Sequence, residues 1–237
     1  MPLFPSILKN SEINESDYRS VDAVSQSMLR LFQLAPTPFH FYLQNLAPRR
    51  PTQQQTPAMA LGSLLHRRLE LGDSPTYLQE HTVTPKGLRR GTKAHKEFQA
   101  LHTGKKLICS ADWTQVEAMY QSIMKNKAAK ILLSGGYPEE SFFDRYEDTP
   151  VKGRLDYRQE KLKAIVDVKS AITGDPFSKV GFAKTVFSAL YDWQAAFYVD
   201  AMKRLTGETY AFVFVVVEKT YPYACSLHTL PTLTLPS

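Results

Sequence analysis

The stretch GRLDYRQEKLKAIVDVKSA, residues 153–171, sets charged side chains into an alternating apolar pattern. Side chains of a strand alternate between two faces, so Asp167 and Lys169 point the same way while their apolar neighbours point the other. Asp156 belongs to the preceding predicted strand, and a short hairpin turn brings it beside Asp167. Two neighbouring carboxylates repel each other and are tolerated mainly where a cation lies between them. This hairpin therefore constrains both the fold and the chemistry.

A hard cation suits such a site. Carboxylate oxygens held on a stiff sheet are ligands for Mg²⁺ or Mn²⁺. The alternative is a set of exposed strand charges that pair with nearby basic residues, namely Arg154, Arg158 and Lys163. The apolar residues around Asp167 favour a buried strand. The residues alone leave both interpretations open.

The rest of the chain predicts a mixed α/β (α+β) fold. Three strands with two-residue alternation form an antiparallel meander, at Ser141–Tyr146, Val151–Arg158 and Lys163–Lys169. The apolar run at residues 209–219 is typical of a fully buried strand. Helices are expected at residues 26–35, 58–72, 110–133 and 185–207. The basic segment 84–106 indicates a surface loop with a short helix. We expect a mixed central sheet flanked by helices.

Length and composition favour one folded unit. A chain of 237 residues, 43% of them hydrophobic, is long enough for one substantial core. We expect a polar extension at residues 1–24, one domain at 25–223 and an irregular tail at 224–237. Only Cys109 and Cys225 are present, and no window has the apolar length of a membrane span, so we expect a cytoplasmic protein without a cysteine-bound metal cluster. The net charge of +6 suits a polyanionic partner or a solvated surface.

Several motifs resemble those of a known nuclease superfamily. GRLDYR, IVDVKSA and YDWQAAFY are similar to motif II, motif III and the downstream Q-x-x-x-Y helix of the PD-(D/E)xK nucleases. ALGSLLHRRLE and SQSMLRLFQLAPTPFHFY resemble, more narrowly, the RecE-like exonuclease branch, which contains exodeoxyribonuclease VIII. The resemblance runs from about Ser25 to Glu218 and implies a restriction-endonuclease-like core.

The resemblance also implies a metal site. It makes His66, Asp156 and Asp167 ligands of a Mg²⁺ ion, for which Mn²⁺ is a substitute. The backbone carbonyl of Val168 is a further implied ligand, and Lys169 orients or deprotonates the attacking water. A lone histidine on a leucine-rich helix is also compatible with a core or surface position, so the role of His66 depends on the resemblance.

The downstream helix and the basic segment supply candidate DNA contacts. Gln194 and Tyr198 lie one helical turn apart, with Tyr191 on the same side. In the family this helix lines the active site, which implies that Gln194 supports catalysis and that all three side chains contact DNA. The two tyrosines are equally compatible with the core. Arg89 and Arg90 are expected to bind DNA phosphates unless their segment is a solvated loop.

Two further acidic residues have open interpretations. Glu70 lies one turn after His66 and could orient its imidazole or a water, but a salt bridge with Arg67 or Arg68 is at least as compatible. Glu140, in PEESFF, directly precedes the first predicted strand and resembles the acidic start of this strand in related nucleases, which is compatible with a role near the metal.

The function implied by the resemblance is a metal-dependent exonuclease. RecE-like enzymes resect linear double-stranded DNA from its 5′ ends, leave 3′ single strands for an annealing protein, and assemble into homo-oligomeric rings. The alternatives are an endonuclease of the same superfamily, a DNA-binding module that has lost cleavage, and a structural domain. An enzyme is favoured because all four candidate residues are present, namely His66, Asp156, Asp167 and Lys169. A Cas4-like nuclease is disfavoured because the cysteines for an iron–sulfur cluster are missing.

Overall fold

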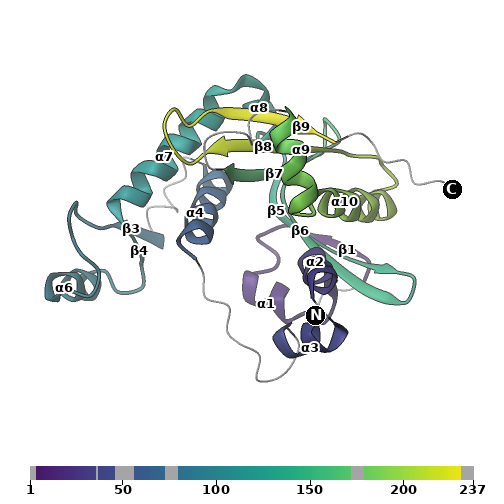
Figure 1. Cartoon of the computed structure of the whole chain (residues 1–237), viewed down its shortest axis with the longest axis horizontal. Coiled ribbons are helices and arrows are strands. Elements are labelled where there is room, and N and C mark those ends of the chain that lie inside the picture. The colour runs from purple at the N-terminus through teal and green to yellow at the C-terminus, as the bar shows by residue number, and fades with distance from the viewer. Residues whose placement is uncertain (1–3, 36, 46–55, 73–79, 172–178, 231–237) are drawn as a thin grey trace.

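The computed structural model describes residues 4–35, 37–45, 56–72, 80–171 and 179–230 (Figure 1). Within these residues a seven-stranded sheet has the order β1-β5-β6-β7-β8-β9, with β2 paired to β6. The strands are β1 (Ser6–Leu8), β2 (Val24–Ser25), β5 (Tyr137–Tyr146), β6 (Thr149–Gln159), β7 (Ala164–Ala171), β8 (Ala211–Glu218) and β9 (Cys225–Thr229). The strands β5, β6 and β7 form the predicted antiparallel meander, and β8 runs parallel to β7. The mixed α/β fold predicted from the sequence is confirmed.

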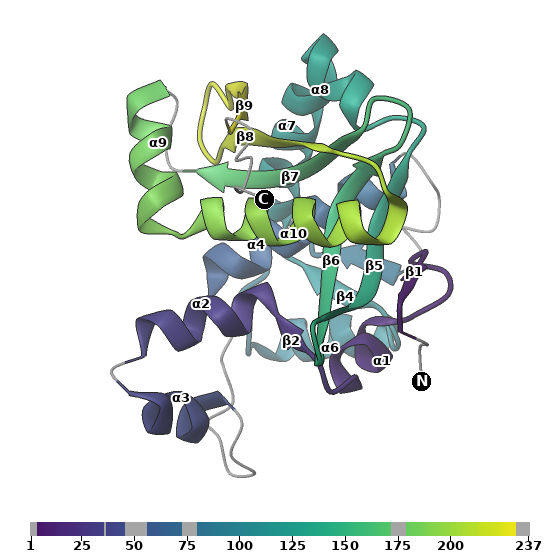
Figure 2. The ribbon, with the colours of Figure 1, turned by 90° about the vertical axis from the view of Figure 1, so that its right-hand side faces the viewer.

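Helices cover both faces of this sheet. The described helices are α1 (Glu15–Ser20), α2 (Gln26–Leu34), α3 (Pro38–Asn45), α4 (Pro57–Leu71), α6 (Lys93–Leu101), α7 (Ser110–Lys125), α8 (Lys127–Leu132), α9 (Lys179–Ser188) and α10 (Tyr191–Thr206). The helices α4 and α7 share one apolar cluster with the sheet, and α9 and α10 share the other. Figure 2 shows α10 crossing one side of the sheet, with α4 on the other. No helix in the described ranges is long and apolar enough to cross a membrane.

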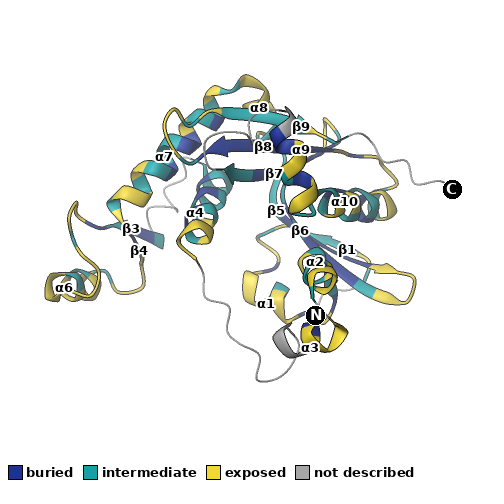
Figure 3. Ribbon diagram, viewed as in Figure 1, coloured by how far each residue is buried: buried dark blue, intermediate teal, exposed yellow. Residues whose placement is uncertain are grey.

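A small parallel pair of strands stands apart from the main sheet. It consists of β3 (His81–Val83) and β4 (Lys106–Ile108), which pair in register along their whole length. With α6, which lies between them in the sequence, these strands form an arm beside α4 (Figure 1). The arm is largely exposed (Figure 3).

The side chains of β7 divide between the two apolar clusters. Val166 and Val168 pack in the cluster that contains Leu65 of α4, whereas Ile165 packs in the cluster of α9 and α10. Full burial of a valine or isoleucine side chain stabilises the fold by roughly 1.5–3 kcal/mol, so the strand is fixed in this orientation. The same alternation puts Asp167 at a position that is only 2% exposed.

The sheet opens between β6 and β7. These strands pair only beside the turn that joins them, from Gln159 and Ala164 to Tyr157 and Val166. Beyond that point β6 stays paired with β5 and also pairs with β2 through Val151 and Lys152. Asp156 is the first residue of β6 past the last pair, so its side chain lies where the two strands separate.

Gly153 of the GRLDYR motif lets α10 approach this opening. A Cβ atom at position 153 would collide with the ring of Phe142 and would lie 2.9 Å from the ring of Tyr198. Tyr198 belongs to α10, so a residue larger than glycine would push the helix away from β6. The first turn of α10, which carries Gln194, therefore remains close to the strands.

The predictions for the two ends of the chain missed a strand at each end. Residues 225–229, expected to be irregular, form β9 and pair with β8; residues 231–237 lie outside the described residues. Ser6–Leu8, within the predicted polar extension, pairs with β5. Both are short edge strands that are only half buried, so alternation in the sequence is weak. The domain boundaries at residues 24 and 223 stay a prediction.

Helix boundaries were also predicted imperfectly. The helix expected at residues 185–207 is two helices, because Leu190 adopts a left-handed conformation with φ 55 and no glycine or proline marks the break. The helix expected at 110–133 divides at Asn126, whose side chain caps α8. The helix expected at residues 26–35 is α2, and a further helix, α3, begins at Pro38, since proline is tolerated in a first turn.

Candidate active site

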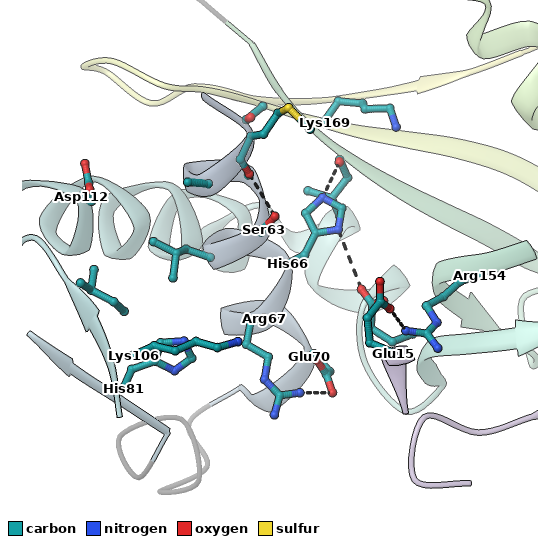
Figure 4. A pocket seen from close by; sticks show the side chains of 18 of the residues that line it. Glu15, Ser63, His66, Arg67, Glu70, His81, Lys106, Asp112, Arg154 and Lys169 are labelled. Atoms are coloured by element: carbon teal, nitrogen blue, oxygen red, sulfur yellow. Dashed lines mark hydrogen bonds and ion pairs between the residues drawn. The ribbon is translucent and has the colours of Figure 1, made fainter. Parts of the chain in front are cut away.

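A cavity of about 1210 Å³ lies beside α4 and the opening of the sheet. Its lining comes from α4, from the arm, from the N-terminal segment and from β5, β6 and β7. Figure 4 shows His66 at the centre of the view, with Glu15 and Arg154 on one side and His81 and Lys106 on the other. We call this space the main cavity.

Carboxylates from three neighbouring strands meet at the opening. The pairing of β5 with β6 puts Glu139 opposite Asp156, and the register of β6 and β7 puts Asp156 next to Asp167. The ligand atoms of His66, Glu139 and Asp156 all lie within 4.8 Å of one another. Glu139 has a φ of 48, a left-handed conformation that is uncommon outside glycine and that concentrates at functional sites.

His66 joins these carboxylates to the backbone of β7. Its Nδ1 lies 3.3 Å from Oδ1 of Asp156 and 3.9 Å from Oε1 of Glu139. Its Nε2 lies 3.0 Å from the carbonyl oxygen of Val168. Burial lowers the pKa of His66, but the adjacent Asp156 carboxylate outweighs burial and raises this pKa to about 9. The free protein therefore carries a protonated imidazole among acceptors.

Lys169 and Gln194 surround the carboxylate of Asp167. Nζ of Lys169 lies 2.7 Å from Oδ2 of Asp167 and donates to Oε1 of Gln194 at 3.3 Å. Nε2 of Gln194 donates to Oδ1 of Asp167 at 2.6 Å, and the Lys169 ammonium lies 4.7 Å from the ring centre of Tyr191. Burial lowers the pKa of Lys169, but Asp167 and Asp156 reverse this and raise it. In the free protein Lys169 is therefore a cation.

The three carboxylates have unequal acidities. Burial and the neighbouring Asp156 raise the pKa of Glu139 to about 8. Burial also raises the pKa of Asp167 to about 6, although Lys169 acts in the opposite direction. The pKa of Asp156 is lowered despite burial, because His66 and Lys169 lie close to it. Crowded like charges thus leave one carboxylate fully ionised and disfavour ionisation of the others.

These groups fit a divalent cation. Oδ2 of Asp167 is buried, and the Lys169 ammonium lies 2.7 Å from it. A cation at the opening would offset the repulsion that raises the pKa values of Glu139 and Asp167. The candidate ligands are the clustered side chains of His66, Glu139 and Asp156, with the Val168 carbonyl. Asp167 lies outside that cluster but close enough to Asp156 and His66 to interact with their charges, and it is the remaining candidate. Oxygen donors with one imidazole suit a hard or borderline divalent metal.

The other candidate DNA contacts occupy different environments. Tyr191 lines the main cavity, and so does Arg90. Tyr198 packs in the core, with its ring edge-on to Phe142. Arg89 is exposed and lies outside the lining of the main cavity. A DNA contact by any of these residues stays a prediction.

The two acidic residues with open interpretations are both paired. Glu70 forms a salt bridge with Arg67, one of the partners considered, and also accepts from Asn10. Glu140 is 2% exposed and forms a buried ion pair with Arg158, including a bond of 3.0 Å. Glu140 therefore supports the sheet and lies outside the lining of the main cavity.

Glu139 is the site residue that sequence reasoning missed. Its side chain faces His66, on the side of β5 opposite to that of Glu140. The adjacent acids in PEESFF were a signal, but the predicted strand began at Ser141 and left the faces of both glutamates undefined. In the structure β5 begins at Tyr137, so both glutamates lie in the strand and point to opposite sides of it.

Comparisons with known proteins identify the family and the fold of the chain. Residues 25–235 match the family described as a PDDEXK-like domain of unknown function (DUF3799). The fold is similar to the crystal structure of a protein from Eubacterium rectale described as a "Putative exonuclease", with a TM-score of 0.64 and 19% identity, covering 93% of this chain and 78% of that one. At this identity the likeness shows the fold alone, and no curated protein matches the chain. Because the family match spans most of its length, the chain belongs to the PDDEXK-like family DUF3799.

Proposed function

We propose that this protein is a nuclease that hydrolyses phosphodiester bonds of DNA with the help of a divalent metal. One observation carries the proposal: the Lys169 ammonium lies 2.7 Å from a buried Asp167 oxygen, beside the cluster of His66, Glu139 and Asp156. Membership of the PDDEXK-like family supports the same reaction class.

Each residue has a role that its contacts suggest. When bound, the metal polarises the phosphoryl group and acidifies a water. Asp156 and Asp167 would hold it, together with the Val168 carbonyl, which lies 3.0 Å from Nε2 of His66. Lys169 would steady negative charge that grows on the phosphate and would orient the attacking water. Gln194 keeps the ammonium in place through its bonds to Lys169 and Asp167.

We further propose a RecE-like activity, in which Mg²⁺ is the natural ion and Mn²⁺ replaces it. The substrate would be the end of linear double-stranded DNA, degraded from the 5′ end to leave a 3′ strand. The motif resemblance supports this reading, as does the fold shared with a protein described as an exonuclease. An annealing protein as partner and a homo-oligomeric ring belong to the same proposal.

The test compares linear and closed-circular duplex DNA of the same sequence, with Mg²⁺ or EDTA. The linear form carries a label at either its 5′ or its 3′ ends, and a Lys169→Ala variant serves as the inactive control. We expect early release of the 5′ label from linear DNA only, dependent on Mg²⁺ and on Lys169. Cleavage of the circle would indicate an endonuclease instead. Tight binding without cleavage in either Mg²⁺ or Mn²⁺ would indicate a DNA-binding module.

A further inference from the structure

A second cavity, of about 590 Å³, lies on the arm next to the main cavity. We call it the arm pocket. Its polar lining residues are Arg90, His95, Lys96, Gln99, Lys105 and Lys106. Arg90, Lys106 and Leu107 line both cavities, so the arm pocket adjoins the main cavity.

The arm pocket differs from the main cavity in charge. None of its lining residues is acidic, whereas the main cavity also contains acidic residues, among them Glu15, Glu139 and Asp112. The side chains of Arg90 and Lys96 form no ion pair or hydrogen bond with any residue that the structure describes. Two cations without a counter-charge, Arg90 and Lys96, give the pocket a positive potential that attracts an anion.

Local bonds keep the basic side chains around the pocket. Gly91, with a φ of 84, turns the chain directly after Arg90. Thr92 then caps α6: its hydroxyl accepts from the backbone of His95 and donates to the carbonyl of Arg89. Lys106 stands on the other wall, at the start of β4. The pocket is therefore formed by paired strands and a capped helix, and not by a loop alone.

We infer that the arm pocket binds backbone phosphates of the DNA strand whose cleaved phosphate lies at the metal site. This inference rests on the proposed function and states which residues bind the substrate strand outside the metal site. Because Arg90 and Lys106 border both cavities, a strand that leaves the metal site meets them first and His95 and Lys96 next. Contacts to phosphates carry no base information, so binding in the arm pocket is independent of DNA sequence.

The test is the salt dependence of DNA binding. The triple variant Arg90→Gln, Lys96→Gln, Lys106→Gln is compared with a control that loses the same charge at exposed lysines of α7 and α8, by Lys125→Gln, Lys127→Gln and Lys130→Gln. Fluorescence anisotropy of a labelled duplex is measured in EDTA over a series of salt concentrations. Each lost phosphate contact lowers the slope of log affinity against log salt by about 0.9.

We expect the arm variant to lose roughly two to three units of this slope and the control to lose less than one. Equal slopes in the two variants would overturn the inference, because net charge alone would then explain binding. The measurement is made without metal, so it reports DNA binding by the arm pocket in the absence of cleavage. Degradation of linear DNA by the wild-type protein with Mg²⁺ reads the proposed nuclease activity separately.

Discussion

Oδ2 of Asp156 accepts the backbone N–H of Val168 at 2.8 Å, just past the point where the ladder between β6 and β7 ends. The carbonyl of the same residue, in the next peptide unit, lies 3.0 Å from Nε2 of His66. Asp156 therefore acts twice: its charge holds the imidazole, and its hydrogen bond satisfies the backbone N–H of Val168.

Asp156→Asn separates these two actions. The amide oxygen still accepts from Val168, but the negative charge is lost, so Mn²⁺ affinity measured by calorimetry should fall by about 100-fold or more while the fold is kept. Asp156→Ala also leaves the Val168 N–H without an acceptor and should cost a further ~1–3 kcal/mol of unfolding free energy. Wild-type Mn²⁺ affinity in the Asn variant would rule out Asp156 as a ligand.

The adjacent residues Glu139 and Glu140 should respond in opposite ways to the same substitution. Glu139→Gln should weaken Mn²⁺ binding and leave thermal stability unchanged or improved, because it removes repulsion with Asp156. Glu140→Gln removes the buried counter-charge of Arg158 and leaves only the exposed Glu160 carboxylate at 3.6 Å, so it should cost about 3 kcal/mol. Thermal melts and Mn²⁺ titrations of both variants check this. Weaker Mn²⁺ binding by Glu140→Gln alone, with a loss of stability in Glu139→Gln alone, would contradict the structure.

The metal-free protein should become less stable as the pH rises. The folded-state pKa of Glu139, about 8, lies above its ordinary value of 4.5, so the folded state binds more protons between these values. His66, whose pKa is raised from 6.5 to about 9, acts in the same direction. Stability decreases with pH wherever the folded state binds more protons. The Tm in EDTA should therefore fall between about pH 6 and pH 9, and Glu139→Gln should flatten the lower part of this slope.

Gln194 is a positioning residue, since it bridges Asp167 and Lys169. Gln194→Ala should lower kcat for DNA cleavage by roughly 10- to 100-fold, because misplacement of a catalytic group by about 1 Å has effects of this order. KM and Mn²⁺ affinity should change little. Trp193→Ala removes the exposed neighbour on α10 and is the matched control. Equal losses in the two variants would mean that α10 is merely destabilised.

The meander could be predicted from the sequence because its middle strand, Val151–Arg158, alternates with a period of two and its neighbours alternate over part of their length. The same alternation predicted that Asp167 and Lys169 share a face, and the structure places them 2.7 Å apart. His66 lies a hundred residues away from Val168 in the sequence, and only the motif resemblance linked the two. The mixed sheet followed from the long apolar run, which became β8.

The remaining features depend on tertiary contacts that leave little local signal. Leu190 breaks the downstream helix by its left-handed backbone conformation, although leucine favours helices. β9 is a short edge strand that exists through pairing with β8. The arm likewise requires β3 and β4 to meet across an intervening helix. For Glu139, an unusual backbone conformation determines which glutamate faces His66.

The most direct test of the metal site is the anomalous scattering of Mn²⁺ in crystals of the wild-type protein. The structure predicts a peak within about 2.5 Å of carboxylate oxygens from Asp156 and Asp167, with the Val168 carbonyl and the His66 imidazole as neighbours. A peak found only elsewhere, in crystals where these side chains are ordered, would contradict the proposed metal centre.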